Sequence, residues 1–362
     1  MKAVLERVLD GGHLSMQEAC EVVTALATGG VQNGGGVQSG GSDGPVEPAV
    51  AGALLAALRA KGETAEEVAG FAMGMRAMAR RPAVDAKRAA EAVDIVGTGG
   101  DGLGTYNLST GAALVCAAAG LPVIKHGNRA ISSQSGAADV LAALGLGMPL
   151  DEARAAGCFE ATGFTFLFAP QYHPAVGRIA AVRRTLGVRT IFNMLGPLTN
   201  PAQPGYGLIG AYSMKAAEVM AGAFAAMPIR RVLVVHADNG MDEPTPASPA
   251  TVLMVTPGAV ERTKVDAGML GLRPCEVGEL KGGNAEHNAR AMRAVFAGEK
   301  SAHRDAVVMS AGLALWAAGR AGSAPIGVNM ACAAIDDGRA AKLLDRLAKE
   351  FGPAAGGEGG GG

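Results

Sequence analysis

The sequence has little of several features that mark particular classes of protein. Its 362 residues carry 32 Lys and Arg against 33 Asp and Glu, so neither charge is in excess to attract nucleic acid or an acidic membrane surface. Its five cysteines form no CxxC pair, which argues against a zinc knuckle and against a disulfide framework. We expect them to be small buried hydrophobic residues in a reducing compartment. They are Cys20, Cys116, Cys158, Cys275 and Cys332.

Long apolar runs are missing as well. No stretch approaches the roughly 20 residues of a membrane helix, and the N-terminus lacks the layout of a signal peptide. The composition is nevertheless 49% hydrophobic, which is enough to bury a large core in one large domain or two. We therefore expect a cytoplasmic protein with no membrane and no nucleic-acid partner, or a plastid protein if a transit peptide precedes this chain.

Two hydrophobic patterns divide the chain. Residues 1–27 and 47–81 have apolar positions at helical spacing, and each stretch predicts two helices. Thr64, placed before two glutamates, is a candidate start for the fourth helix. The Gly-rich residues 28–45 predict a low-complexity surface insertion.

After residue 89 short β-rich runs alternate with Ala-rich helical ones. The runs are "VDIV", "LPVIKH", "FTFLF", "RVLVVH" and "TVLMV". Strands that are apolar on both faces and separated by helices predict an α/β domain with a mainly parallel central sheet. The final residues, 352–362, are almost all Gly, Ala and Pro and predict a disordered tail.

The stretch "DIVGTGGDGLGTYNLST", residues 94–110, predicts a phosphate site, because a strand, a glycine-rich turn and a helix N-terminus bring backbone N–H groups together. Gly97-x-Gly99-x-x-Gly102 matches the letters of the dinucleotide fingerprint, but three further residues precede the helix. No Gly-Lys-Ser/Thr follows, which excludes a P-loop. Asp101 would repel bare phosphate, so a sugar phosphate with magnesium is favoured over a tight turn without function.

A second donor-rich loop, "KHGNRAISSQSG" at residues 125–136, follows the apolar "LPVI". It should lie at the carboxyl end of a strand beside the first loop, where ligands bind in parallel sheets. Its Lys, Arg, Asn and three Ser could hold an oligophosphate. A solvated polar loop is the alternative, but two such loops after consecutive strands favour a binding site.

These motifs resemble those of a known family. "GTGGD" with "NLST", "KHGNR", "VRRTLGVRTIFNMLGPLTNP" and "GMDE" occur in the order and spacing of the anthranilate phosphoribosyltransferases of tryptophan biosynthesis, over nearly the whole chain. The resemblance implies transfer of the phosphoribosyl group of PRPP (5-phosphoribosyl diphosphate) to the amino group of anthranilate, with release of pyrophosphate. It also implies a fold of the nucleoside phosphorylase and phosphoribosyltransferase type and a homodimer formed through the helical parts.

The expected division is a helical subdomain at residues 1–88 beside an α/β domain at residues 89–351. Helices near residues 173–190 are expected to pack with the helical subdomain.

The resemblance also carries site residues over by position. The PRPP-binding positions are Gly97, Gly100, Asp101, Thr105, Asn107, Leu108, Ser109, Thr110, Lys125, His126, Gly127, Asn128, Arg129, Ala130, Ile131, Ser132, Ser133 and Ala137. The anthranilate-binding positions are Gly97, Asn128 and Arg183, with His126 and Pro197 lining the same channel. The magnesium ligands are Ser109, Asp242 and Glu243, for about two Mg²⁺ per active site.

The implied chemistry is electrostatic. Magnesium, Lys125 and loop N–H groups would neutralise the departing pyrophosphate, and Arg183 would hold the anthranilate carboxylate in a bidentate fork. No side chain is assigned as a general base. Taken singly, Asp242 and Glu243 could form a solvated turn and Arg183 could sit on an exposed helix face. Their joint occurrence favours function.

Two departures and two rival functions accompany this reading. Ala137 stands where the family usually has Ser, and Asn284 where Asp is more usual. One rival is a pyrimidine nucleoside phosphorylase, which would not need a magnesium pyrophosphate clamp. The other is a non-catalytic relative that binds nucleic acid, which would need a basic surface.

Overall fold

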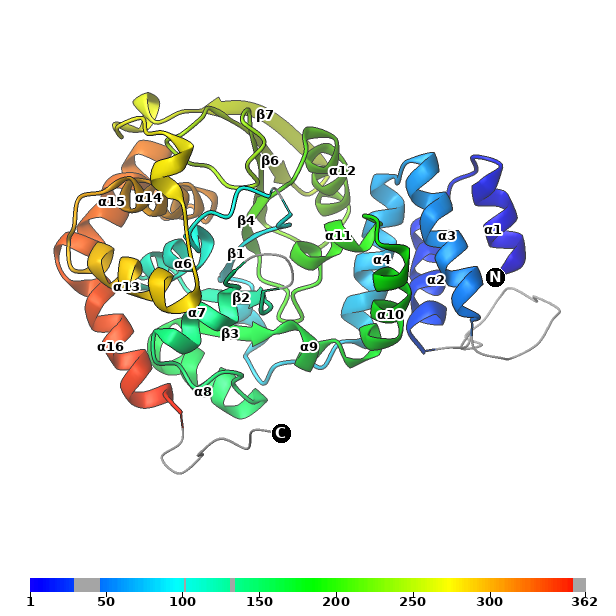
Figure 1. Ribbon diagram of the computed structural model, residues 1–362, viewed down its shortest axis with the longest axis horizontal. Coiled ribbons are helices and arrows are strands. Elements are labelled where there is room, and N and C mark those ends of the chain that lie inside the picture. Colours follow the sequence, from blue (N-terminus) through cyan, green and yellow to red (C-terminus); the bar gives the residue numbers. More distant parts are fainter. Residues whose placement is uncertain (29–45, 101, 131–133, 354–362) are drawn as a thin grey trace.

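The computed structural model describes residues 1–28, 46–100, 102–130 and 134–353. The predicted insertion and tail therefore lie largely outside the described residues, as do the site positions Asp101, Ile131, Ser132 and Ser133. In Figure 1 a bundle of helices lies beside a larger part built on a sheet. None of the helices in the described ranges is both long and apolar enough to cross a bilayer.

A seven-stranded sheet forms the centre of the larger part. Its strands are β1 (Val93–Gly97), β2 (Val123–Gly127), β3 (Phe164–Phe168), β4 (Tyr206–Gly210), β5 (Arg231–Ala237), β6 (Ala250–Thr256) and β7 (Ala259–Val265). The order is β3-β2-β1-β4-β5-β6-β7. The strands from β3 to β5 pair in parallel, and β6 and β7 are antiparallel. The mainly parallel α/β sheet is confirmed.

Helices account for most of the remaining chain. The first group is α1 (Lys2–Leu9), α2 (Met16–Thr28), α3 (Pro48–Lys61), α4 (Ala65–Met78), α5 (Ala86–Ala89), α6 (Leu108–Ala118), α7 (Ala137–Ala143) and α8 (Glu152–Thr162). The second group is α9 (Ala169–Tyr172), α10 (Gly177–Leu186), α11 (Phe192–Leu195), α12 (Met214–Ala225), α13 (Ala285–Phe296), α14 (Ala302–Ala317), α15 (Ala324–Asp336) and α16 (Arg339–Phe351). Short 3₁₀ turns are η1 (Pro174–Val176), η2 (Gly196–Leu198), η3 (Gly268–Leu270) and η4 (Val277–Leu280).

The bundle is formed by α1–α4 together with α10 (Figure 1). The predicted start of α4 is confirmed, since Thr64 caps the helix and exchanges hydrogen bonds with Glu67 in a capping box. A Cβ at Gly70 would overlap the Met16 carbonyl, so glycine allows α4 to approach α2 closely. On the other side, Gly52 of α3 faces Val182 of α10. A segment distant in sequence thus completes the bundle.

Two hydrophobic cores lie on opposite faces of β5. Leu233 and Val235 of β5 join the core that also contains α6 and α14. Val232 and Val234, which point to the other face, join the core of α12 and the helical bundle. The bundle is therefore packed onto the sheet through α12, and its apolar interior continues onto one face of β5.

The side of the sheet to which new strands are added changes at β1. From β1 the chain adds β2 and β3 on one side, and it then returns to place β4 on the other side of β1. Ligands of open α/β sheets bind at the carboxyl ends of the strands beside such a change. Gly97 ends β1, and its register partner Gly210 ends β4, so these two glycines mark the place.

Three expectations from the sequence need correction, two of them at segment boundaries. Thr28, placed in the insertion by sequence, is the last residue of α2. Gly352, placed in the tail, accepts a hydrogen bond at its carbonyl from Nη2 of Arg154 at 2.7 Å. Of the five cysteines only Cys116 and Cys158 are buried, whereas the other three are partly exposed.

Candidate active site

Asp242 lies directly against the glycine-rich turn between β1 and α6, the glycine loop. Its Oδ2 accepts a hydrogen bond from the Gly99 N–H at 2.6 Å. Side chains at Gly97 or Gly210 would overlap Asp242, so the two strand-ending glycines leave the space that the aspartate fills. The residue is only 6% exposed, which contradicts the reading of a solvated turn for Asp242. The turn after β5 is thereby fixed against the turn after β1.

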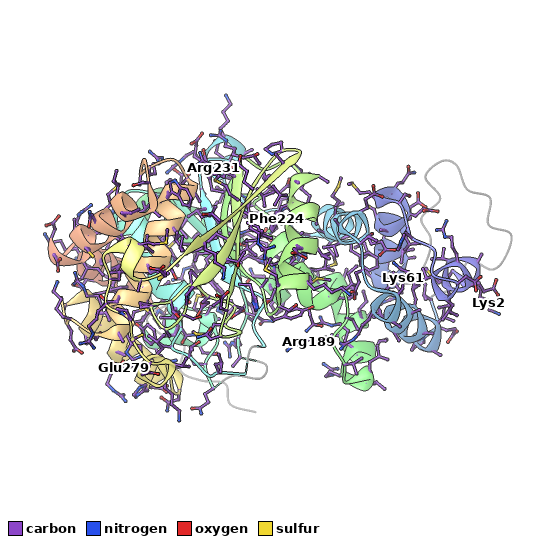
Figure 2. All side chains as sticks on the ribbon, turned by 90° about the horizontal axis from the view of Figure 1, so that it is seen from above. Lys2, Lys61, Arg189, Phe224, Arg231 and Glu279 are labelled. Carbon is purple, nitrogen blue, oxygen red and sulfur yellow. The ribbon has the colours of Figure 1, made fainter. Side chains whose placement is uncertain are left out.

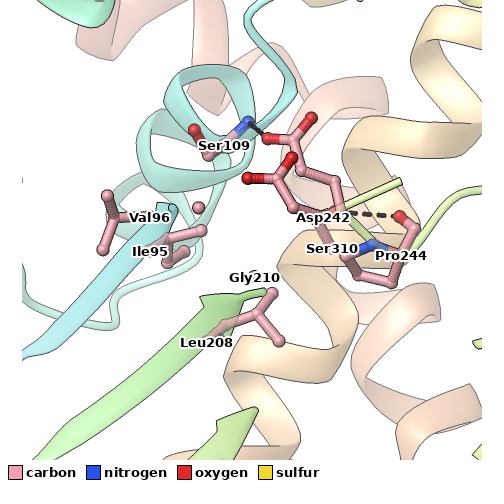
Figure 3. A pocket seen from close by; sticks show the side chains of 10 residues that line it. Ile95, Val96, Ser109, Leu208, Gly210, Asp242, Pro244 and Ser310 are labelled. Atoms are coloured by element: carbon pink, nitrogen blue, oxygen red, sulfur yellow. Dashed lines mark hydrogen bonds between the residues drawn. The ribbon is translucent and has the colours of Figure 1, made fainter. Parts of the chain in front are cut away.

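Glu243 faces the start of α6. Its Oε1 accepts a hydrogen bond from the Ser109 N–H at 3.1 Å (Figure 3). Figure 3 also shows the Asp242 carboxylate pointing toward Ser109. The pocket between these groups is lined by Gly97, Ser109, Gly210, Asp242 and Glu243 among others. The three magnesium positions expected from the sequence are therefore brought together, two carboxylates opposite a helix N-terminus.

The glycine loop has a backbone that few other residues could adopt. Gly99, Gly100, Gly102 and Gly104 all have positive φ angles between 61° and 80°. The loop is supported from behind by the turn that contains Gly282, whose N–H donates to the Gly104 carbonyl at 3.0 Å. This support was not visible in the sequence, because the two segments are far apart along the chain.

The end of the loop is held by a pair of asparagines. Asn107 accepts a hydrogen bond from Nδ2 of the buried Asn288 at 2.8 Å, and it donates to the Ser135 carbonyl at 3.1 Å. Asn107 thus joins the two donor-rich loops. The neighbouring Leu108 and Thr110 are fully buried. Thr105 forms an isolated β-bridge with Lys281.

Lys125 is buried in the middle of β2, beneath both loops. Its Nζ donates to the Ile95 carbonyl and lies 3.3 Å from Oγ of Ser109. Burial lowers the pKa of Lys125, whereas the negative charges of Asp94 and Glu243 raise it. The lysine lies next to the predicted diphosphate position.

Asp94 was missed as a site residue, although a carboxylate within the apolar run "VDIV" was a signal. Its Oδ1 accepts from the His126 N–H at 3.3 Å and its Oδ2 from Nδ2 of Asn200 at 2.9 Å. Asn200 also donates to the Ile124 carbonyl at 2.8 Å. Asp94 and Asn200 thereby fasten β1 and β2 to the segment after η2.

Asp139 contacts two described positions of the second loop. Its Oδ2 accepts hydrogen bonds from the N–H groups of Ala130 and Gly136, at 2.9 and 3.0 Å. Asn128 accepts from the Arg129 N–H at 2.7 Å through its side-chain oxygen. Gly127 leaves room for the side chains of Phe166 and Ala137. Asn284, the other departure from the family pattern, caps α13 by accepting from the His287 N–H at 2.9 Å, which Asn does as well as Asp.

His126 and His173 form a buried aromatic pair with ring centroids 5.1 Å apart. Nδ1 of His126 is 3.3 Å from the Gly196 carbonyl, and Nε2 of His173 is 3.0 Å from the Thr199 carbonyl. Burial, reinforced by His173, lowers the pKa of His126 to about 3. The hydrogen bonds are consistent with structural roles for both histidines, and the lowered pKa keeps the His126 ring neutral at pH 7.

Arg183 lies on α10, at the side of the helical bundle. Its guanidinium is 5.3 Å from the ring centroid of Phe192, and burial lowers its pKa. It is half-buried, which contradicts the reading of an exposed helix face. Within the described residues it forms no ion pair and no hydrogen bond to Gly97 or Asn128. The structure therefore leaves its guanidinium donors available on a stacked, partly desolvated side chain.

Known proteins match this chain over nearly its full length. Residues 89–341 match the α/β domain of a glycosyl transferase family, and residues 2–79 match the helical bundle domain of that family. An anthranilate phosphoribosyltransferase of Methylocella silvestris is 44% identical over 96% of this chain and 94% of its own length.

Solved structures agree. The anthranilate phosphoribosyltransferase of Thermus thermophilus superposes with a TM-score of 0.85 at 38% identity, covering 96% of this chain and 99% of its own. The enzyme of Saccharomyces cerevisiae in complex with PRPP and Mg superposes with a TM-score of 0.83 at 25% identity, covering 97% of each chain. With the two-loop site at the carboxyl ends of β1 and β2, the chain belongs to the anthranilate phosphoribosyltransferases of tryptophan biosynthesis.

Proposed function

We propose that PRPP binds where the glycine loop, the start of α6 and Lys125 converge, and that anthranilate approaches from the side of α10. One observation carries the proposal: Asp242 and Glu243 are hydrogen-bonded to the very N–H groups, of Gly99 and Ser109, that form the expected phosphate site. Carboxylates in an anion site repel a diphosphate unless a cation lies between them. A magnesium-bound diphosphate is the ligand that fits both the N–H groups and the carboxylates.

The donor set suits magnesium. Ser109, Asp242 and Glu243 would hold it through oxygen atoms, which a hard cation prefers. The described residues contain no group of three or more His, Cys, Asp or Glu that could bind a metal alone. Oxygen atoms of the diphosphate would complete the coordination, and we propose about two Mg²⁺ per site on this basis. When bound, magnesium neutralises charge that develops on the leaving pyrophosphate.

The protein groups act mainly by charge and position. Displacement of pyrophosphate from the anomeric carbon builds negative charge on the leaving group, which Lys125 and the N–H groups of the glycine loop would stabilise. Arg183 would hold the anthranilate carboxylate with two parallel hydrogen bonds and direct the amine to the sugar, while Asn128 and Gly97 complete the acceptor site. The face of its guanidinium is already stacked on Phe192, so its edge can bind the carboxylate.

No side chain is proposed as a general base. His126, the imidazole within the second loop, has a pKa of about 3 and would be a weak proton acceptor at pH 7. The amine of anthranilate is uncharged at that pH and loses its proton after attack, so water can accept it. The phosphorylase alternative has no comparable use for Asp242 and Glu243.

The activity is tested by the loss of anthranilate fluorescence when protein, PRPP and magnesium are combined. Loss should require both PRPP and metal. Arg183→Ala should lower kcat/KM for anthranilate by about 10²-fold, the range for removing one preorganised donor. Arg184→Ala, which removes an exposed arginine from the same helix, is the matched control and should behave as wild type. Equal losses in the two variants would remove Arg183 from the acceptor site.

Asp242→Asn tests the metal assignment. We expect the magnesium concentration at half-maximal rate to rise by about tenfold, because one charged ligand becomes neutral. Thr245→Ala, a buried change three positions along the same turn, controls for disturbance of the turn. An unchanged magnesium requirement in Asp242→Asn would exclude this carboxylate as a ligand.

We also propose a homodimer formed through the helical bundle. Leu9 at the end of α1 and Met73 on α4 are large apolar residues with exposed fractions of 66% and 41%. A dimer formed through the bundle would cover such side chains. Light scattering after size exclusion measures the mass, and a monomer at micromolar concentration would contradict the proposal. The expected cytoplasmic location stays a prediction.

A further inference from the structure

Arg189 lies between the two parts of the chain (Figure 2). It follows α10, and its backbone carbonyl accepts a hydrogen bond from Nη1 of Arg59 in the last turn of α3. Its own Nη2 donates to the Gly100 carbonyl at 2.7 Å. Its guanidinium is 4.4 Å from the ring centroid of Tyr212, just after β4. One residue therefore connects the helical bundle to the glycine loop.

The glycine loop gains most from such a connection. Gly99, Gly100, Gly102 and Gly104 have positive φ angles, and glycine has more backbone conformations to give up on ligand binding than any other residue. Arg189 holds one carbonyl of this loop with a charge-assisted hydrogen bond, and Tyr212 fixes the plane of the guanidinium. This hydrogen bond restricts Gly100 before a ligand binds.

We propose that Arg189 is a positioning residue for PRPP, which holds Gly100 in the conformation that receives the diphosphate and makes that conformation depend on the helical bundle. The inference rests on the proposed function, because it takes the glycine loop as the PRPP site. The proposal also assigns two roles to the segment from α10 to Arg189. Arg183 faces the acceptor, and Arg189 orders the loop for the donor.

Lys215 provides a matched control. Arg59, Arg189, Tyr212 and Lys215 line a single pocket of about 230 Å³ at the junction. Arg189 and Lys215 therefore contribute equal positive charge to the same space. Across the described part of the chain Lys215 forms no ion pair and no hydrogen bond through its ammonium group. Replacing it removes the charge without releasing the loop.

The experiment compares Arg189→Met, Arg189→Lys, Arg59→Met and Lys215→Met. Equilibrium binding of magnesium PRPP, measured by calorimetry, and KM for both substrates are the readouts. Arg189→Met should raise Kd and KM for PRPP by about tenfold, as for the loss of one hydrogen bond to a charged group, with a smaller change in KM for anthranilate. Arg189→Lys should restore part of the affinity, because an ammonium can donate to Gly100 but cannot stack like a guanidinium. Arg59→Met should also raise Kd and KM for PRPP, but by a smaller factor.

Three results would overturn the inference. Equal effects of Arg189→Met and Lys215→Met would assign the change to the electrostatic field alone. A lower melting temperature with unchanged PRPP affinity would show that Arg189 only supports the fold. Unchanged binding and stability would show no role at all. Failure of the wild-type protein to bind PRPP would instead overturn the proposed function, so the two failures are distinguishable.

Discussion

At the scale of single residues, the charges buried under the two loops depend on one another. Burial raises the pKa of Asp94 to about 6, and the charge of Lys125 and the hydrogen bond from Asn200 oppose that rise. Burial lowers the pKa of Lys125, and Asp94 is the first of the two acids that oppose the fall. Each charge therefore makes the other less costly inside the protein.

Lys125→Met should destabilise the protein in a pH-dependent way. The folded pKa of Asp94 already lies above its ordinary value of 3.8, so its ionised form costs stability above about pH 6. Below pH 3.8 the group is protonated in both states and costs nothing. Without Lys125 the folded pKa rises further. We expect a loss on the order of 3 kcal/mol at pH 8 and a smaller loss at pH 5, measured by urea unfolding.

The double variant Lys125→Met with Asp94→Asn is the control for that experiment. It removes both charges and keeps a polar group near Asn200. Its unfolding free energy should vary less between pH 5 and pH 8 than that of Lys125→Met. If the single variant loses the same stability at both pH values, Asp94 is not the group responsible.

At the scale of elements, the sequence predicted what local patterns carry. The apolar runs identified β1, β2, β3, β5 and β6, and the helical spacing identified α1–α4. Two strands were missed. In β4 the sequence "YGLIG" loses its pattern because Gly207 and Gly210 have no side chains, and β7 is exposed at every position except Val265. Edge strands and glycine-rich strands lack the alternation on which such predictions depend.

The candidate site also contains parts that the sequence predicted and parts that it did not. Both loops and the Asp242-Glu243 pair were predicted, because each is a compact motif. The hydrogen bonds of Asn288 to Asn107 and of Asn200 to Asp94 join residues 181 and 106 positions apart. Arg189 was visible within a quoted motif, but its bond to Gly100 depends on the packing of the bundle against the sheet. Contacts of this kind follow from tertiary structure and leave no local signal.

Thr64→Ala tests the element whose start was predicted most specifically. The Thr64 hydroxyl accepts from the Glu67 N–H at 3.2 Å, and the variant leaves that donor without its cap. We expect the unfolding free energy to fall by about 1 kcal/mol. Thr24→Ala in α2 is the matched control, because among the described residues its hydroxyl bonds only to the Cys20 carbonyl of its own helix. A loss as large in Thr24→Ala would show that the cap has no special effect.

At the scale of the whole molecule, the two parts share a core. Leu55 and Phe71 of the bundle belong to the same hydrophobic cluster as Val232 and Val234 of the sheet. Separating the parts would expose apolar surface on both. We therefore expect one cooperative unfolding transition for the bundle and the sheet together.

Leu55→Ala tests this cooperativity. Leu55 is fully buried, and its truncation should cost about 3 kcal/mol. Trp316, the only tryptophan, lies on α14 in the larger part and reports on that part by fluorescence. The thermal transition should shift by the same amount in circular dichroism and in Trp316 fluorescence. Met269→Ala, at a 62% exposed site, should shift neither. A fluorescence transition that stays at its wild-type temperature would mean independent unfolding.

The late arrival of α10 in the bundle has a consequence for synthesis. Helix α4 ends at Met78 and α10 begins at Gly177, so about 100 residues are added between them. At roughly 5–20 residues per second, the first four helices emerge from the ribosome about 5–20 s before their remaining partner. During that interval the apolar surface that α10 and the sheet later cover is open to chaperones and to neighbouring nascent chains. The first part of the protein to be made is thus among the last to be completed.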